Sequence, residues 1–305
     1  MNAATKLGVY VLGLAVVFGG ALGAGNAVGT AGSAPGPARQ PAHATPAADG
    51  HGDHGTAKGD TPGGLQVSEN GYTLSPLTTV EAGEPADFRF TVTGPDGRPV
   101  TDYQVQHDKK LHFIVVSRDL ASFQHLHPVL GADGVWSVPL TLKEPGAYRA
   151  FADFVPAGGS GLTLGADLLV AGKYAPRAPA PVSRAATVDD YTVYLRGDLV
   201  PGQASKLTLS VSKDDRPVTD LQRYLGAYGH LVALRGGDLA YLHVHPEDGA
   251  TAGPEITFHA QVPSGGEYRL FLDFQHEGKV RTAAFTARAV SVRQAIQSDG
   301  HDHTH

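Results

Sequence analysis

Six histidines occupy matching positions in two similar stretches of this sequence, and imidazoles in such a pattern can bind a metal ion. Residues 98–128 align without a gap with residues 216–246, an offset of 118, and 10 of the 31 aligned positions are identical. Three of the identical positions are histidines, so that His112, His125 and His127 match His230, His243 and His245. Because only 15 of the 305 residues are histidine, three matches in register indicate a duplicated domain that carried its histidines along.

The spacing of these histidines suits a site built from two neighbouring β-strands. In His125-Leu-His127 the two imidazoles are two residues apart, so on a strand they project from the same face. His112 opens a β-branched run and can bring a third imidazole from the adjacent strand. Three imidazoles from two strands suit Zn²⁺ or Cu²⁺, with a fourth position for water or a carboxylate. The pattern predicts one such site in each copy of the domain.

Further candidate ligands accompany the six histidines. The sequence Tyr-Arg-x-Phe-x-Asp-Phe occurs at residues 148–154 and again at 268–274, and its aspartates are candidate oxygen ligands or hydrogen-bond partners of ligands. These aspartates are Asp153 and Asp273, and His276 is an additional candidate in the second copy. His107 is an extra imidazole without a counterpart in the second copy. The carboxy-terminal His/Asp tract is typical of loose, accessory metal association, through His301, His303 and His305.

A second interpretation makes the same histidines structural. A His-x-His-Pro sequence at the end of a strand can hydrogen-bond to the turn that follows, and a duplicated domain also repeats its structural residues. In that case the chain is a non-catalytic module for interaction with an envelope protein. A metal site requires imidazole nitrogens of His112, His125 and His127 within about 4 Å of one another, whereas structural histidines have separated rings bonded to backbone carbonyls.

Composition narrows the chemistry of any metal site. The chain has no cysteine, and its only methionine is Met1, so neither a thiolate site nor a sulfur-based copper(I) site can form. The net charge of −6, without a dense Lys/Arg segment, argues against nucleic acid as a partner. No nucleophile elbow, zinc-protease motif, phosphate loop or dinucleotide fingerprint occurs, and we expect no enzymatic activity and no organic cofactor.

Strand-like alternation of apolar and polar residues dominates the chain from residue 65 onwards. Runs such as 88–92, 111–117 and 135–142 are separated by turns rich in Gly, Pro and Asp, and no convincing helical period occurs. About seven short strands in roughly 105 residues are typical of an immunoglobulin-like sandwich, in which Tyr148 and Tyr268 fit the position of a tyrosine corner. We therefore predict an all-β fold of two tandem immunoglobulin-like β-sandwiches, at 65–172 and 185–292, joined by a Pro-rich linker at 173–184.

The amino-terminal 28 residues predict a membrane segment. Residues 7–28 are largely apolar and uncharged, long enough to cross a bilayer, and Lys6 before them places the start of the chain inside. This length favours an uncleaved signal anchor, while the small residues near 24–27 would also permit cleavage and secretion. Residues 29–64 predict a disordered linker and residues 293–305 a His-rich tail. The expected location is the cell membrane, with a single pass and extracytoplasmic sandwiches.

Residues 110–113 (Lys-Leu-His-Phe), 125–128 (His-Leu-His-Pro) and 152–154 (Ala-Asp-Phe) together form a pattern that resembles exported bacterial sandwich domains of the YtkA-like and CopC-like kind. It is similar above all to His-bearing, membrane-anchored actinobacterial proteins. The resemblance covers residues 65–292, and it implies an immunoglobulin-like fold and a role in handling copper or another metal outside the cytoplasm. This chain differs from CopC-like domains because no ligand histidine opens its sandwich at a free amino terminus and it lacks a Met-rich loop.

Overall fold

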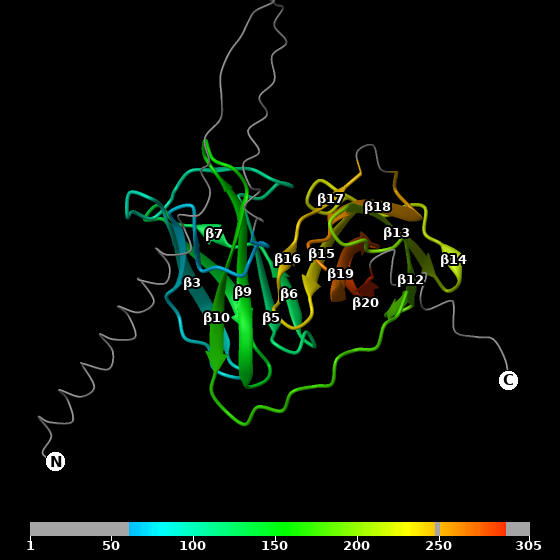
Figure 1. Ribbon diagram of the computed structural model, residues 1–305, viewed down its shortest axis with the longest axis horizontal. Helices are drawn as coiled ribbons and strands as arrows, with labels where there is room; N and C mark the ends of the chain where they lie inside the picture. Colours follow the sequence, from blue (N-terminus) through cyan, green and yellow to red (C-terminus); the bar gives the residue numbers. More distant parts are fainter. Residues whose placement is uncertain (1–60, 248–250, 291–305) are drawn as a thin grey trace, which may run out of the picture. The chain divides into compact units, whose positions relative to one another are not determined.

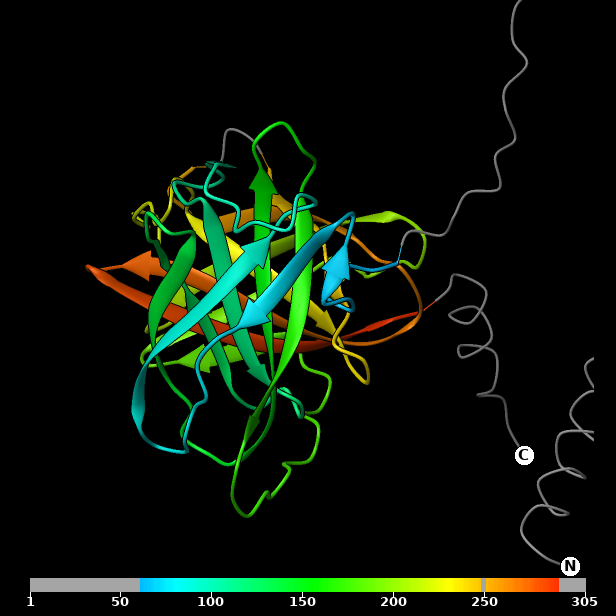
Figure 2. The same cartoon turned by 90° about the vertical axis from the view of Figure 1, so that its left-hand side faces the viewer.

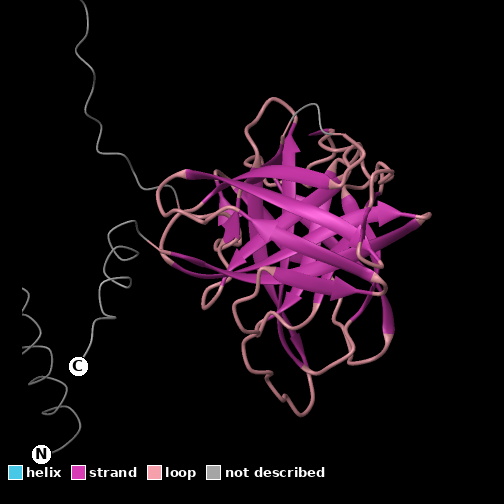
Figure 3. Ribbon diagram, turned by 90° about the vertical axis from the view of Figure 1, so that its right-hand side faces the viewer, coloured by secondary structure: helices cyan, strands magenta, loops and turns pink. Residues whose placement is uncertain are grey.

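A computed structural model describes residues 61–247 and 251–290, and all of their regular secondary structure is β-strand (Figure 3). Within these ranges no helix is long and apolar enough to span a membrane. The predicted anchor at 1–28, most of the linker at 29–64 and the tail at 293–305 with its three histidines lie outside the described residues.

The first domain consists of two antiparallel sheets (Figures 1 and 2). One sheet has the strand order β1-β2-β3-β8-β7, and the other has the order β10-β9-β5-β6, with the short strand β4 paired to β9. The strands are β1 (Ser68–Glu69), β2 (Tyr72–Pro76), β3 (Pro85–Thr93), β4 (Tyr103–Gln104), β5 (Leu111–Ser117), β6 (Phe123–Leu126), β7 (Val129–Leu130), β8 (Val135–Thr141), β9 (Gly146–Pro156) and β10 (Leu162–Val170).

The second domain repeats this arrangement. Its sheets have the orders β11-β12-β13-β18-β17 and β16-β15-β19-β20, with β14 paired to β13. The strands are β11 (Ala185–Val188), β12 (Tyr191–Arg196), β13 (Ala204–Lys213), β14 (Arg216–Pro217), β15 (Gly229–Arg235), β16 (Tyr241–Leu242), β17 (Val244–Pro246), β18 (Glu255–Gln261), β19 (Gly266–His276) and β20 (Lys279–Ala289).

Both domains have the strand order of an immunoglobulin-like sandwich, and the prediction of an all-β chain with two tandem sandwiches is confirmed. Near the start of β9 the hydroxyl of Tyr148 donates to the carbonyl of Glu144 at 2.8 Å. The hydroxyl of Tyr268 in β19 donates to the carbonyl of Ser264, also at 2.8 Å. A tyrosine at the start of this strand that bonds back to the preceding corner is the tyrosine corner of the fold, as predicted.

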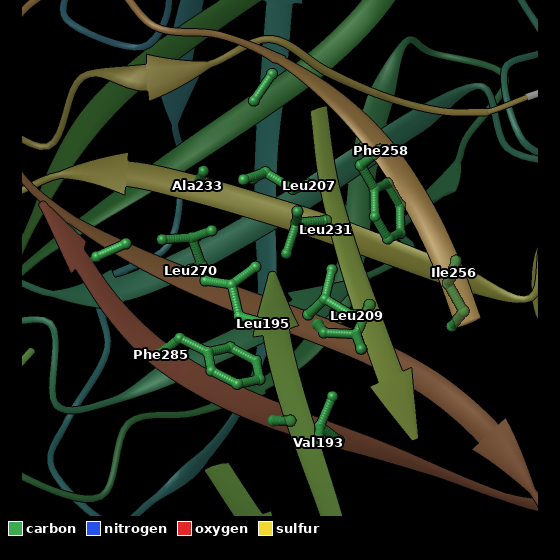
Figure 4. Packing of buried hydrophobic residues seen from close by; sticks show 14 of the residues in the cluster. Val193, Leu195, Leu207, Leu209, Leu231, Ala233, Ile256, Phe258, Leu270 and Phe285 are labelled. Carbon is green, nitrogen blue, oxygen red and sulfur yellow. The ribbon is translucent and has the colours of Figure 1, made fainter. Parts of the chain in front are cut away.

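Each sandwich has its own apolar core between its two sheets. Strand alternation aims every second residue of β3 inward, and there the rings of Phe90 and Phe113 stack with centroids 4.5 Å apart. In the second sandwich, residues from facing sheets interdigitate in the same way, as Leu209, Leu270 and Phe285 do in Figure 4. Two separate cores follow from the duplication.

A third apolar cluster joins the two sandwiches. Strand β5 is buried along its whole length, although only one of its faces covers the core of its own sandwich. Its other face packs with the matching face of the second sandwich, and there the rings of Phe123 and Phe271 stack with centroids 4.0 Å apart. The buried members of the cluster are Ile114, Val116, Phe151, Val232, Leu234, Leu239 and Phe271. His112 shares this face of β5, since it is two residues before Ile114.

Candidate metal centre

Three histidines of the first sandwich converge at one end of the contact between the sandwiches. His112 lies in β5, His125 lies in the neighbouring strand β6, and His127 follows β6 directly. The register pairs His125 with Ile114, so the two strands direct these imidazoles to one face. One nitrogen from each of the three rings lies within 4.8 Å of the others, wider than the separation of about 4 Å predicted for a metal site, and His112 Nδ1 lies 3.1 Å from His125 Nε2.

The spacing of the three rings fits a shared metal ion. Their centroids are 5.3 Å apart for His112 and His125, 5.3 Å for His112 and His127, and 4.8 Å for His125 and His127. Imidazoles bound at metal–nitrogen distances near 2.0–2.1 Å around a tetrahedral ion have centroids about 5 Å apart. The ring positions therefore suit a shared ion. Nitrogens up to 4.8 Å apart must still turn toward one another to bind it, because the nitrogen ligands of a tetrahedral ion lie about 3.4 Å apart.

The hydrogen bonds that His112 and His125 make to groups outside the cluster determine which nitrogen of each ring faces the other histidines. Nε2 of His112 lies 3.1 Å from the carbonyl oxygen of Gln106, which can only accept, so Nε2 carries the proton and Nδ1 a lone pair. Nδ1 of His125 lies 2.8 Å from Oδ2 of Asp273 in the second sandwich, and both side chains are buried. A carboxylate accepts this proton, so neutral His125 also presents a lone pair, at Nε2. Two lone pairs then face each other at 3.1 Å, and the gap between them requires a proton or a metal ion.

His127 adds a third nitrogen without a partner. Its Nε2 is buried and has no hydrogen-bond partner among the described residues. The hydroxyl of Tyr224, from the second sandwich, lies 3.5 Å from the other ring nitrogen. A buried polar atom without a partner is costly in a folded protein, and a bound metal ion would satisfy it.

Burial keeps His112 and His127 neutral. Burial, together with the neighbouring ring of His125, lowers the pKa of His112 to about 3. The pKa of His127 is also lowered to about 3, chiefly by burial. Neutral imidazole is the form that binds metal, so both rings are in their binding form at neutral pH without losing a proton.

The histidines of the second sandwich do not form an equivalent group of three. His230 matches His112 closely, since its Nε2 lies 2.7 Å from the carbonyl oxygen of Tyr224, the counterpart of Gln106. Its ring lies 6.2 Å from that of His112 and 6.2 Å from that of His125, across the contact between the sandwiches. His243 and His245 form a perpendicular pair with centroids 4.0 Å apart, and His245 is exposed. Among the described residues, only the first set closes into a three-histidine group.

The remaining candidates occupy three different environments. Asp273 accepts hydrogen bonds from His125 and, at 2.5 Å, from the hydroxyl of Thr282. Asp153 accepts a bond from Thr163 at 2.8 Å, and burial raises the pKa of its carboxyl group, although the Thr163 bond and the charge of His243 oppose the shift. His276 does not join the cluster. It lies three residues after Asp273, so it projects from the opposite face of β19, where its ring bonds to Tyr191 and Asp220.

Sequence reasoning did not identify the groups that orient the ligands. Gln106 and Tyr224 act through backbone carbonyls, which any residue supplies, so side-chain type holds no signal for them. Thr282 and Thr163 were detectable in principle, because they occupy matching positions opposite the two repeated aspartates. The approach of Asp273 to His125 joins residues 148 positions apart and depends on how the sandwiches pack.

We expect the metal-free protein to lose stability in mild acid. An unfolded histidine titrates near pH 6.5, whereas buried His112 and His230 have pKa values lowered to about 3 and about 4. Below pH 6.5 the unfolded chain therefore binds protons that the folded chain does not, so the free energy of unfolding falls with falling pH. From pH 7 to pH 5 the loss is about 2 kcal/mol for each of these two imidazoles.

Urea unfolding in the presence of a chelator measures this loss. The matched variant carries His112→Gln and His230→Gln, which removes both titrating groups, and its stability should vary less over the same range. The same pH dependence in the chain and in this variant would contradict the prediction.

Comparisons with known proteins identify a family but no activity. The family model described as "Domain of unknown function (DUF8832)" matches twice, at residues 66–169 and 186–291. A search of curated proteins found no match. Among solved structures, the Escherichia coli adhesin FdeC is 13% identical over 73% of this chain, with a TM-score of 0.25, and the match spans 65% of the adhesin chain. MtrC from Shewanella baltica is 10% identical over 72% of this chain and 70% of its own, with a TM-score of 0.24. We base no inference about function on either likeness.

Proposed function

We propose that this chain, which belongs to the DUF8832 family, is a metal-binding protein that buffers or delivers Cu²⁺ or Zn²⁺ outside the cytoplasm. The ligands are His112, His125 and His127. The observation that carries the proposal is the 3.1 Å approach of His112 Nδ1 to His125 Nε2, while the other nitrogen of each ring faces an acceptor oxygen.

The surrounding groups also favour a metal ion over a structural hydrogen-bond network. A structural network would pair each ring nitrogen with a donor or acceptor, but Nε2 of His127 is buried and has no partner within residues 61–247 and 251–290. Asp273 holds His125 in the tautomer that a ligand needs, as carboxylates do for metal-bound histidines. The rings supply three nitrogen ligands and leave a fourth position for water, which permits exchange of the ion with a partner.

Cellular location forms the second part of the proposal. Residues 1–28 serve as an uncleaved signal anchor, so that the sandwiches extend from the outer face of the cell membrane on the linker at 29–64. Cleavage near 24–27 would instead release a secreted protein with the same site. His301, His303 and His305 then act as a loose accessory collector of ions. The role is binding, and we propose no catalysed reaction.

Titration of the full chain with Zn²⁺ by calorimetry tests the metal site. The experiment uses a background in which the histidines outside the described ranges are replaced by alanine. These are His43, His51 and His54 of the linker at 29–64, which could also collect ions, and the accessory collectors His301, His303 and His305. We expect this background to retain at least one ion bound with a Kd below about 1 μM, equivalent to about −8 kcal/mol. Only millimolar association in this background would contradict the proposal, and the histidines would then be structural parts of an interaction module.

A further inference from the structure

A pocket of about 180 Å³ lies beside the three-histidine site, between the two sandwiches. Its lining includes His112 and His125, and it also includes four groups that the three-histidine site does not use as ligands: His107, His230, Asp153 and the pair His243 and His245. These groups come from both sandwiches.

His107 occupies an unusual backbone position for its type. It lies in the left-handed region, with φ of 48°, at the first of two such residues in the tight turn before β5. Asn, Asp and Gly are the residues that such a turn prefers. The imidazole of His107 makes no hydrogen bond among the described residues, so the side chain does not stabilise the turn. It instead lines the pocket, with its ring 5.4 Å from that of His230.

Ring spacing assigns His230 to this pocket and not to the first site. The centroid of its ring lies 6.2 Å from the ring centroids of both His112 and His125. The ring centroids of the three ligands are only 4.8–5.3 Å apart. The 5.4 Å between His230 and His107 matches the ligand spacing. Nε2 of His230 is bonded to the carbonyl of Tyr224, so its Nδ1 is the nitrogen available to an ion.

Asp153 supplies a carboxylate that, unlike its counterpart Asp273, has no histidine bonded to it among the described residues. Asp273 accepts hydrogen bonds from Thr282 and from a histidine of the other sandwich, His125. Asp153 accepts the matching bond from Thr163, but no histidine is bonded to it among the described residues. Its charge interacts with His243, with His125 of the first site and with His107, which all line the same pocket. An enclosed carboxylate with no bonded cation favours a positive ion beside it.

We propose that this pocket binds a second divalent cation of the Cu²⁺ or Zn²⁺ class, held by His107, His230 and Asp153 and completed by one imidazole of the His243–His245 pair. Among the described residues these ligand atoms do not converge as those of the first three histidines do, so binding requires the side chains to move toward one another. The proposal rests on the proposed function for the class of ion. Since His107 and His245 are exposed whereas His112 is buried, the second ion is the weaker and faster-exchanging one. Imidazole and carboxylate are the ligands that such ions take in the absence of sulfur.

The test uses Zn²⁺ calorimetry on the full chain, in the background without the six accessory histidines. We expect two binding events, of which the weaker loses at least tenfold in affinity in His107→Asn and in Asp153→Asn, while the tighter changes less than threefold. Asparagine suits left-handed backbone, so His107→Asn removes the imidazole without straining the turn. Leu225→Asn is the matched control, because it introduces the same residue at the equivalent turn position, where φ is 52°, and removes no ligand.

A second measurement separates two neighbouring ions from two distant ones. The electron paramagnetic resonance of Cu²⁺ should show an isolated signal at one equivalent and loss of that signal by spin coupling at two. His107→Asn should retain the isolated signal. A single ion whose binding is lost in His127→Ala and unchanged in His107→Asn would overturn the second site and leave the proposed function intact. Absence of tight binding altogether would overturn both.

Discussion

Replacing His125 and His127 together by alanine should abolish tight metal binding at the contact between the sandwiches. The variant loses two of three nitrogen ligands and leaves only His112, so we expect the Kd for Zn²⁺ at the tighter site to rise on the order of 1000-fold, or about 4 kcal/mol. Stabilisation by the ion should disappear with it, because Zn²⁺ at 100 times its Kd adds about 2.7 kcal/mol to the free energy of unfolding. Calorimetry and thermal unfolding with and without Zn²⁺ measure the two effects.

The matched control replaces the equivalent pair of the second sandwich, His243 and His245, by alanine. Their rings do not belong to the closed group of three, so the tighter event should change less than threefold. Equal loss in both double variants would mean that the two sandwiches bind ions equivalently. An unchanged tighter event in His125→Ala/His127→Ala would refute the assigned ligands.

Replacing Phe271 by alanine should weaken the contact between the sandwiches and, through it, the metal site. Phe271 is 3% exposed and stacks on Phe123 with ring centroids 4.0 Å apart. Truncation of a buried phenylalanine costs about 3–5 kcal/mol, part of which is the cavity that it leaves. Asp273, which orients His125, lies two residues away on the same face of β19. We therefore expect lower resistance to urea together with a 10–100-fold loss of Zn²⁺ affinity, the range found when a partner that orients a ligand is lost.

Tyr194→Ala serves as the control for this prediction. Tyr194 is an aromatic residue of the same sandwich, but it is 52% exposed in β12 and belongs to none of the three apolar clusters. Its replacement should change neither quantity. If Phe271→Ala lowered stability and left Zn²⁺ affinity unchanged, the site would be a property of the first sandwich alone.

Much of each sandwich was predictable because strand periodicity is local. Residues 88–92 alternate apolar and polar side chains, and β3 has its apolar members in the core. The same rule placed His125 and His127 on one face and brought His112 to it from the neighbouring strand. Where this rule was not applied, the expectation failed. His276 lies an odd number of residues after Asp273 and therefore faces the other way.

The sequence repeat did not determine whether the two sandwiches form equivalent histidine sites. Two copies of one sequence pattern suggest two copies of one site, yet the described residues close only the first group of three histidines. The copies differ at the turn before β5 and its counterpart β15, where His107 of the first sandwich aligns in sequence with Leu225 of the second. They also differ after that strand, since His243 and His245 pair with each other. The first difference is visible in the sequence, whereas the pairing of His243 with His245 is seen only in the tertiary structure.

The sequence by itself determined the duplication, the two immunoglobulin-like sandwiches and the three histidines that share one strand face, because register and alternation act over a few residues. Only the tertiary structure decided that β5 is buried on both faces, that its second face packs on the other sandwich, and that Asp273 thereby reaches His125. The physical reason is that a run of apolar residues shows that a strand is covered but not what covers it.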